Sequence, residues 1–217
     1  MRKRVIVPIV EGYGEERAVP LLIRRWLAHR NLAAWFDVPE LAVNTKGSGR
    51  LKGQFDPIRH IGIEHYVRAA LARQPDAILV LLDADDECLS RPKGKGKGLG
   101  PALLERARAV APHVPLAVVV ANREYEAWFL ASLASLRIKN LLSQARLPEP
   151  LAPEAPRNCK GLIEQLMGCR YEERVHQLKL TSGLTFSPRA TFRSPSYGKL
   201  LRDLERLTHE ARHRRPA

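Results

Sequence analysis

Three runs of consecutive apolar residues stand out along the chain. They cover residues 4–10 (RVIVPIV), 77–82 (AILVLL) and 115–121 (PLAVVVA), and they contain many β-branched side chains. A short run that is apolar at every position is typical of a strand buried on both faces, as in a parallel sheet. A weaker strand is predicted at residues 38–43. The pattern therefore predicts about four strands.

Segments with helical spacing lie between these strands. Helices are predicted over residues 15–30, 61–73, 101–111 and 124–134, because apolar positions recur there every three or four residues. In the first of them the apolar positions are Val19, Leu22, Ile23, Trp26 and Leu27. The regular alternation of strand and helix predicts an α/β fold, with a parallel sheet covered by helices on both faces.

The alternation ends near residue 135, which suggests how the chain is organised. Residues 1–135 are expected to form the α/β domain, and residues 136–217 a mainly helical extension packed on the same domain. Residues 147–156 (LPEPLAPEAP) are rich in proline and read as a connector. A polar segment at residues 44–56 is longer than a simple connection requires, so it is predicted to be a long loop.

Acidic residues follow all three strong strands. Glu11 comes after the first, Asp83 and Asp85 after the second, and Glu124 and Glu126 after the third. In open parallel sheets the carboxyl ends of the strands meet at one edge, where ligands bind. Carboxylates gathered there repel one another unless a cation is bound, and oxygen ligands suit Mg²⁺ or Mn²⁺. For any single acid, a helix cap or a solvated loop position is the alternative.

Two of these strand ends carry a resemblance to a known family. Glu11 followed by Gly12, and the later pair Asp83 and Asp85 in an Asp-x-Asp motif, resemble the Toprim domain of topoisomerases, primases and overcoming-lysogenization-defect nucleases. Glu15, four places after Glu11, is similar to the nuclease branch. An Asp-x-Asp after a strand also resembles haloacid-dehalogenase phosphatases and metal-dependent glycosyltransferases, but those phosphatases usually carry it on the first strand.

Four blocks extend the resemblance over most of the chain. VEGYGEERAVP, LLDADDE, ANREYEAWFLAS and RSPSYGKL together resemble a Toprim-like bacterial group, domain-of-unknown-function family 4276. Members of that group commonly occur beside AAA-type ATPases in loci resembling phage-defence systems. The resemblance therefore implies an ATPase partner and a nuclease acting on phosphodiester bonds in phage defence.

The resemblance also implies roles for individual residues. Asp83 and Asp85 would be metal ligands, Glu11 a ligand or the general acid or base, and Glu15 part of a second metal position. Two ions, Mg²⁺ or Mn²⁺, would then clamp the attacking and leaving oxygens of a phosphodiester displacement. Of the two acids after the third strand, Glu124 is favoured as the one that reaches the metals, because it is nearer the strand.

The charge balance indicates a polyanionic partner. The chain has 36 Lys and Arg against 23 Asp and Glu, a formal net charge of +13, which favours nucleic acid. The loop at residues 91–98 (RPKGKGKG) leaves the strand that carries Asp83, so its cations are candidates for holding a phosphate backbone. Lys199, in the block RSPSYGK, is a candidate cation for the transition state. The proposed nucleic-acid contacts are Arg91, Lys93, Lys95, Lys97 and Lys199.

Other features limit the class of protein. The cysteines Cys88, Cys159 and Cys169 are too widely spaced for a CxxC motif, and a reducing compartment is expected. No run of 18 or more apolar residues is present, so we expect a cytoplasmic protein without a membrane span. Neither a Walker A loop nor a dinucleotide-binding GxGxxG motif is present.

Two further possibilities stay open at this point. The first is a homodimer, which is compatible with a small domain of this type, although no segment marks an interface. The second is a non-catalytic basic adaptor that binds nucleic acid or an ATPase and uses the acids only for structure. This adaptor would keep its function after Glu11→Gln or Asp83→Asn, whereas a nuclease would not.

Overall fold

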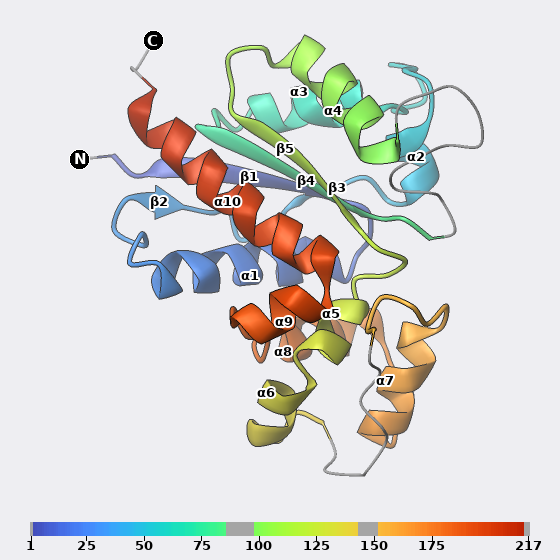
Figure 1. Cartoon of the computed structure of the whole chain (residues 1–217). Coiled ribbons are helices and arrows are strands. Elements are labelled where there is room, and N and C mark those ends of the chain that lie inside the picture. Colours follow the sequence, from blue (N-terminus) through green and yellow to red (C-terminus); the bar gives the residue numbers. More distant parts are fainter. Residues whose placement is uncertain (1, 86–97, 143–151, 215–217) are drawn as a thin grey trace.

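The fold is a parallel sheet between layers of helices (Figure 1). The computed structural model describes residues 2–85, 98–142 and 152–214. All strand pairs in the sheet are parallel, and the helices that connect them lie on both of its faces. The predicted α/β class is therefore confirmed.

The strong strands lie where the apolar runs predicted them. The sheet has the order β2-β1-β4-β5, and β3 also pairs with β1. The single strand predicted at residues 38–43 is wrong: one short strand precedes this segment and another begins at its last residue, Val43. Pro39 within the segment has no N–H to donate to a neighbouring strand. The strands are β1 (Arg4–Val10), β2 (Phe36–Asp37), β3 (Val43–Asn44), β4 (Ala77–Asp83) and β5 (Leu116–Ala121).

A proline inside the central strand β1 has a local explanation. β2 pairs with Arg4 and Val5 of β1, and β3 pairs with Ile9 and Val10, which leaves a gap between them. The backbone groups of alternate residues point to the same side, and those of Arg4 and Val10 point toward the β2 and β3 side. Pro8 shares this orientation, so its missing N–H lies at the gap and costs no strand pairing.

Two helices on each face of the sheet complete the core. α1 (Glu15–His29) and α10 (Pro195–His213) pack against one face, and α3 (Ile63–Leu71) and α4 (Leu99–Val110) against the other. The side chains of β1 alternate between the two cores, with Ile6 and Val10 on the α1 side. The chain thus folds as the alternation of strand and helix predicts.

The strand order creates a topological switch point between β1 and β4. From β1 the chain moves outward through α1 to β2 and β3, and then crosses the other face to β4, on the opposite side of β1. At such a point the two connections leave the sheet in opposite directions, and the carboxyl ends of the two strands border a crevice. Glu11 follows β1 and Asp83 ends β4, so both lie at this position.

The remaining helices differ from the predictions in two places. The segment at residues 44–56, predicted as a loop, contains a short helix. The helix predicted over residues 124–134 is divided at Ser132, whose backbone N–H bonds to the carbonyls of both Trp128 and Phe129. These helices are α2 (Ser48–Lys52), α5 (Ala127–Ala131), α6 (Leu133–Ile138), α7 (Cys159–Met167), η1 (Glu173–Gln177), α8 (Leu178–Thr181) and α9 (Pro188–Arg193).

The C-terminal helices share a core with the sheet. Tyr197, Leu200 and Leu204 of α10 are fully buried in the same hydrophobic cluster as Leu79 and Val119 of the strands. α10 therefore packs directly on the sheet (Figure 1). Within the described part of the chain, no helix combines the length and the hydrophobicity that a membrane span requires.

Candidate active site

Glu11 and Asp83 meet at the switch point. The backbone N–H of Asp83 donates a hydrogen bond of 3.2 Å to Oε2 of Glu11, and Oδ1 of Asp83 accepts one of 3.0 Å from the N–H of Tyr125. Burial raises the pKa of Glu11, although the hydrogen bond from Asp83 and the charge of Lys52 oppose this. The ends of β1 and β4 thus bring two predicted site residues into contact.

Asp83 lies at the centre of a group of acids. Its pKa is raised well above the ordinary value, first by burial and then by the negative charges of Glu126, Glu15 and Glu11. Lys160 is a positive charge that opposes this effect. The described part of the chain therefore concentrates several carboxylates around Asp83, and a bound cation would relieve their mutual repulsion.

Glu126 is the most unusual member of this group. Its side chain is 1% exposed, and within the described residues neither carboxylate oxygen has a hydrogen-bond partner. Burial raises its pKa to about 7, against the opposing charge of Lys160. The buried hydroxyl of Tyr171 lies close enough to this carboxylate to lower its pKa, although no hydrogen bond of ordinary geometry joins the two groups. Buried polar groups are almost always paired, so an unpaired carboxylate here needs an explanation.

The C-terminal part of the chain adds residues to the site that the sequence did not reveal. Nε2 of Gln177, at the end of η1, donates a hydrogen bond of 2.9 Å to Oε1 of Glu15. A Cβ atom on Gly14 would lie 1.6 Å from Oε1 of Gln177, so only glycine allows this approach. Arg174 stacks over the ring of Tyr13 at 4.3 Å. Because η1 is a π-helix, its side chains do not follow the α-helical period, and no pattern in the sequence marks it.

Lys160 is the second contribution of that region. It lies in the first turn of α7, and its Nζ forms an ion pair with Glu173 of η1. Glu126 and Glu173 raise the pKa of Lys160, so this residue is a permanent cation beside the acids. No sequence pattern marks Lys160 as a site residue, because it lies far from the strand ends and in none of the four blocks.

Asp85 lies at the outer side of the site. Its side chain is exposed, with Oδ2 3.6 Å from Nζ of Lys52 in α2. Its backbone has a φ of 52°, in the left-handed region, and its N–H bonds to the carbonyl of Arg123. The charge of Asp85 contributes to the raised pKa of Glu11, which places both acids in the same electrostatic environment.

Glu124, which the sequence favoured over Glu126, has a different set of partners. Its Oε2 accepts hydrogen bonds from the backbone N–H groups of Cys159 (3.0 Å) and Lys160 (3.3 Å) at the start of α7. A carboxylate at this position satisfies otherwise unpaired N–H groups and interacts favourably with the helix dipole. Of the two acids, it is Glu126 that shares the surroundings of Asp83.

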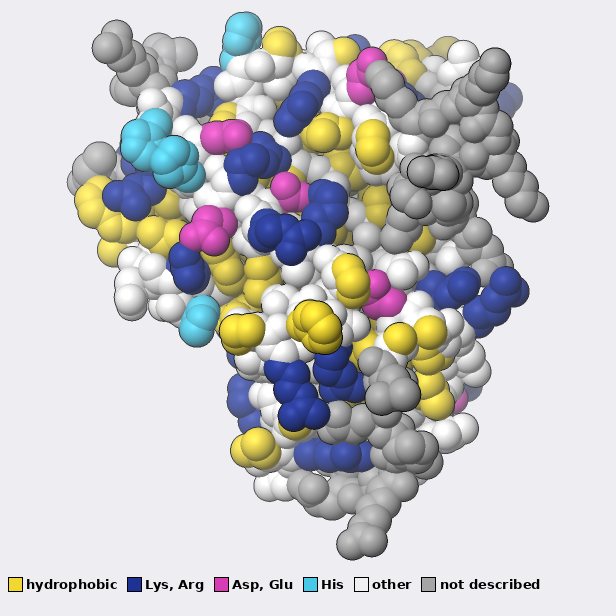
Figure 2. Space-filling model, viewed as in Figure 1, with side chains coloured by type: hydrophobic (Ala, Val, Ile, Leu, Met, Phe, Trp, Pro, Cys, Tyr) yellow, Lys and Arg dark blue, Asp and Glu magenta, His cyan; other side chains and the backbone are white. Residues whose placement is uncertain are grey.

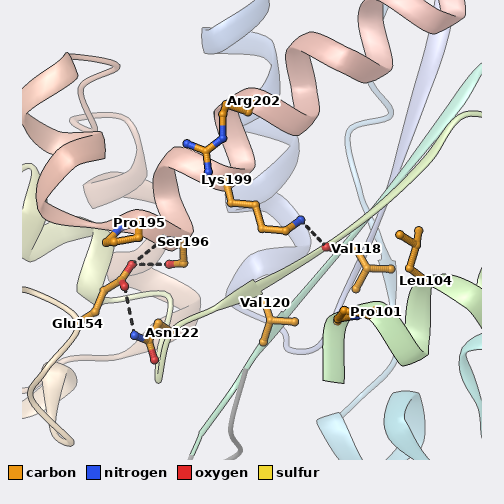
Figure 3. Close-up of a pocket in the computed structure, with 11 residues that line it drawn as sticks. Pro101, Leu104, Val118, Val120, Asn122, Glu154, Pro195, Ser196, Lys199 and Arg202 are labelled. Carbon is orange, nitrogen blue, oxygen red and sulfur yellow. Dashed lines mark hydrogen bonds between the residues drawn. The ribbon is translucent and has the colours of Figure 1, made fainter. Parts of the chain in front are cut away.

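Lys199 lies at the outer edge of β5 (Figure 3). Its Nζ donates hydrogen bonds to the carbonyl of Val118 (2.9 Å) and to Asp203 (2.5 Å). It therefore covers part of the open edge of the sheet, and Arg206 does the same at Leu116. These contacts give Lys199 a structural role, and its role as a cation for the transition state stays a prediction.

The rest of the block RSPSYGK holds another carboxylate. Glu154 is 8% exposed and accepts hydrogen bonds from the hydroxyls of Ser194 and Ser196 and from the N–H of Ser196. Its other oxygen accepts one from Asn122, directly after β5 (Figure 3). The block thus forms the N-terminus of α10, and Glu154 accepts hydrogen bonds from the polar groups at that end of the helix. The proposed nucleic-acid contacts Arg91, Lys93, Lys95 and Lys97 lie outside the described residues.

The donor set suits a hard divalent cation, but it is not assembled around one point. Glu11, Glu15, Asp83 and Glu126 offer only carboxylate oxygens, which are the ligands that Mg²⁺ and Mn²⁺ prefer. The unpaired oxygens of Glu126 fit the same conclusion. As the side chains stand, the described residues contain no group of three His, Cys, Asp or Glu arranged to hold a metal ion. Binding a metal would therefore require side chains to rotate toward one another.

The raised pKa of Glu126 should make the stability of the protein depend on pH. Because the pKa of Glu126 is higher in the folded than in the unfolded protein, the folded state loses stability as the pH rises from 4.5, the ordinary pKa of Glu, to about 7. Glu126→Gln removes this loss, so in EDTA the variant should gain about 3 kcal/mol relative to wild type over that window. Urea unfolding at pH 4.5 and pH 7.5 measures the difference. An equal stability difference at both pH values would contradict the buried, unpaired state of Glu126.

The fold and the site define a class of protein. This is an α/β protein with a parallel sheet whose topological switch point gathers acidic residues. Residues 10–205 match the model of the family described as domain of unknown function (DUF4276), and the chain belongs to that family. The match confirms the resemblance to family 4276 that was drawn from the four sequence blocks, whereas the likeness to the Toprim domain stays a prediction. No curated protein and no solved structure matches the chain.

Proposed function

We propose that this protein is an Mg²⁺- or Mn²⁺-dependent nuclease that hydrolyses phosphodiester bonds. The observation that carries the proposal is the buried carboxylate of Glu126, without a partner among the described residues, in the same electrostatic environment as Asp83 and Glu15. Without a bound cation such a site destabilises the protein, because the buried Glu126 and the half-buried Glu11, Glu15 and Asp83 repel one another. A bound cation would remove this repulsion, so the carboxylates would bind it tightly.

Each acid has a proposed role. Glu11, Glu15, Asp83 and Glu126 would hold the metal ions, and Asp85 would join them from the outer side. When bound, the ions would neutralise the phosphate and lower the pKa of an attacking water. Glu11 is suited to exchange a proton with solvent, because it is only half-buried and its pKa is raised.

Two lysines suit the site to an anionic substrate. Lys52 lies beside Asp85 at the outer side, and Lys160 lies beside Glu126 at the inner side. A phosphate between them would meet positive charge from both directions. The resemblance to the family extends the proposal to action beside an AAA-type ATPase in phage defence, and the net charge of +13 supports nucleic acid as the substrate.

A second candidate function is the basic adaptor. One observation favours it: among the described residues, no group of three His, Cys, Asp or Glu side chains is arranged to hold a metal ion. An adaptor would bind nucleic acid or an ATPase without cleaving any bond. It would show the same binding in EDTA as in Mn²⁺.

The test is cleavage by the purified protein of supercoiled plasmid, linear DNA and single-stranded RNA in Mg²⁺, Mn²⁺ or EDTA. We expect cleavage of at least one substrate with either metal and none in EDTA. In parallel, Mn²⁺ should raise the melting temperature of the wild-type protein, because a ligand that binds the folded state stabilises it. If Mn²⁺ changes neither melting nor cleavage, also in the presence of a co-purified ATPase, the adaptor is the better account.

A further inference from the structure

Three neighbouring hollows lie along the exposed side of α10 and its surroundings. The first, of about 460 Å³, lies between the edge of β5, α4 and the first turns of α10 (Figure 3). The second, of about 260 Å³, shares Arg202 with the first. The third, of about 490 Å³, shares His29, Phe186 and Pro188 with the second. The hollows therefore form a row of neighbouring depressions that share lining residues and that cross α10 at Arg202, and we call this row the α10 groove.

Positive charge predominates along the α10 groove. Lys199 and Arg202 line the first hollow, Arg30 and Arg202 the second, and Arg25 and Lys139 the third. Among the described residues, two acids line it: Glu154 accepts hydrogen bonds from serine hydroxyls, and Glu205 is paired with Arg30. On the face that α9 and α10 present in Figure 2, Lys and Arg side chains alternate with hydrophobic ones.

Arg202 differs from the other cations of the groove. Lys199 is bonded to Val118 and Asp203, and Arg25 donates to two backbone carbonyls. Arg202 is exposed and, within the residues that the structure describes, has neither a hydrogen bond nor an ion pair. It lines both the first and the second hollow, so an unpaired guanidinium stands at the middle of the groove.

Aromatic side chains accompany these cations. Phe192 is 87% exposed and directly follows Thr191, which lines the second hollow. Phe186, between the second and third hollows, has the guanidinium of Arg25 over its ring at 5.3 Å. A positively charged groove combined with aromatic rings is the arrangement that holds single-stranded nucleic acid, where phosphates meet cations and bases stack on rings.

We propose that the α10 groove binds a single strand of nucleic acid, with a phosphate on Arg202 and a base stacked on Phe192. This inference rests on the proposed nuclease function for its choice of ligand, since charge alone attracts any polyanion. Each hollow has the size of a site for one small ligand, which suits successive nucleotides of a strand better than a rigid duplex.

The position of the groove relative to the acids supports the same assignment. One end of it is formed by Val120 and Asn122, and Ala121 between them is the register partner of Asp83 in β4. The groove therefore begins at the edge of the sheet where the carboxylates gather. A strand lying in it would extend away from the proposed site of cleavage, across α10 toward α1.

The test is fluorescence anisotropy with short labelled single strands of DNA and of RNA, in EDTA so that no cleavage takes place. Arg202→Ala should weaken binding about fivefold and reduce the slope of log K against log salt by about one. Phe192→Ala should weaken it about tenfold, and Phe192→Tyr should restore binding because it keeps the ring. Both side chains are exposed, so neither variant is expected to disturb folding.

The matched control is Arg108→Ala, which removes the same charge from an exposed position near the end of α4 that lines none of the three hollows. Equal losses for Arg202→Ala and Arg108→Ala would overturn the proposal, because they would show attraction by net charge alone. Unchanged binding in Arg202→Ala and Phe192→Ala, or tighter binding of a duplex than of either strand, would overturn it as well. If the protein binds single strands through Arg202 but cleaves no substrate, the nuclease proposal is refuted and the proposed binding of a strand in the α10 groove still holds.

Discussion

Replacing Asp83 with Asn is expected to lower metal-dependent cleavage about a thousandfold and at the same time to stabilise the metal-free protein. Loss of a charged ligand at the centre of the site removes several kcal/mol of transition-state stabilisation, and each 1.36 kcal/mol is tenfold in rate. Asn can still accept the hydrogen bond from Tyr125. Stability rises because Asn carries no charge to repel Glu126, Glu15 and Glu11. Initial cleavage rates in Mn²⁺ and urea unfolding in EDTA measure the two effects.

Glu124→Gln is the matched control for Asp83→Asn. Glu124 receives hydrogen bonds from the first N–H groups of α7, and the amide oxygen of Gln can accept them too. This variant should therefore keep most of the cleavage activity. A large loss of activity in Glu124→Gln, with activity retained in Asp83→Asn, would refute the assignment of the site to the Asp83 group.

Replacing Trp128 with Ala is expected to destabilise the fold by about 3–5 kcal/mol, the range for a large buried aromatic side chain. Trp128 is 0% exposed, and its Nε1 donates a hydrogen bond of 2.9 Å to the hydroxyl of Ser196. Its ring packs between those of Tyr125 (4.7 Å) and Tyr197 (5.3 Å). Urea unfolding in EDTA provides the measurement. Phe192→Ala, at an exposed position, should change stability by less than about 0.5 kcal/mol.

A loss below about 1 kcal/mol for Trp128→Ala would mean that α10 does not depend on this contact. Trp128 also explains why two distant sequence blocks belong together. The block ANREYEAWFLAS supplies Trp128 and Asn122, and the block RSPSYGKL supplies Ser196, which bonds to Trp128 and to Glu154. Asn122 bonds to the same Glu154. Both blocks therefore form one buried connection between β5 and α10, next to the acidic site.

The sequence by itself determined the three long strands of the sheet and the edge at which the acids that follow them gather. β1, β4 and β5 were predictable because a strand buried on both faces must be apolar at every position, which leaves a clear run of residues. The acids that end these runs were predictable as a group, because the carboxyl ends of parallel strands meet at one edge. β2 and β3 were not predictable, since strands of two residues leave no periodic pattern.

The tertiary structure decided which side chains complete the site. Glu124 and Glu126 are two residues apart, and the local sequence cannot choose between them. The packing of α7 distinguishes the two acids. The first N–H groups of α7 bond to Glu124, while Glu126 is buried and its charge acts on Asp83. Gln177 and Lys160 reach the acids through η1 and α7, more than a hundred residues after Glu11 in the chain. Local pattern specifies where a strand ends, but the direction of the side chains that follow depends on contacts that form only when distant segments pack together.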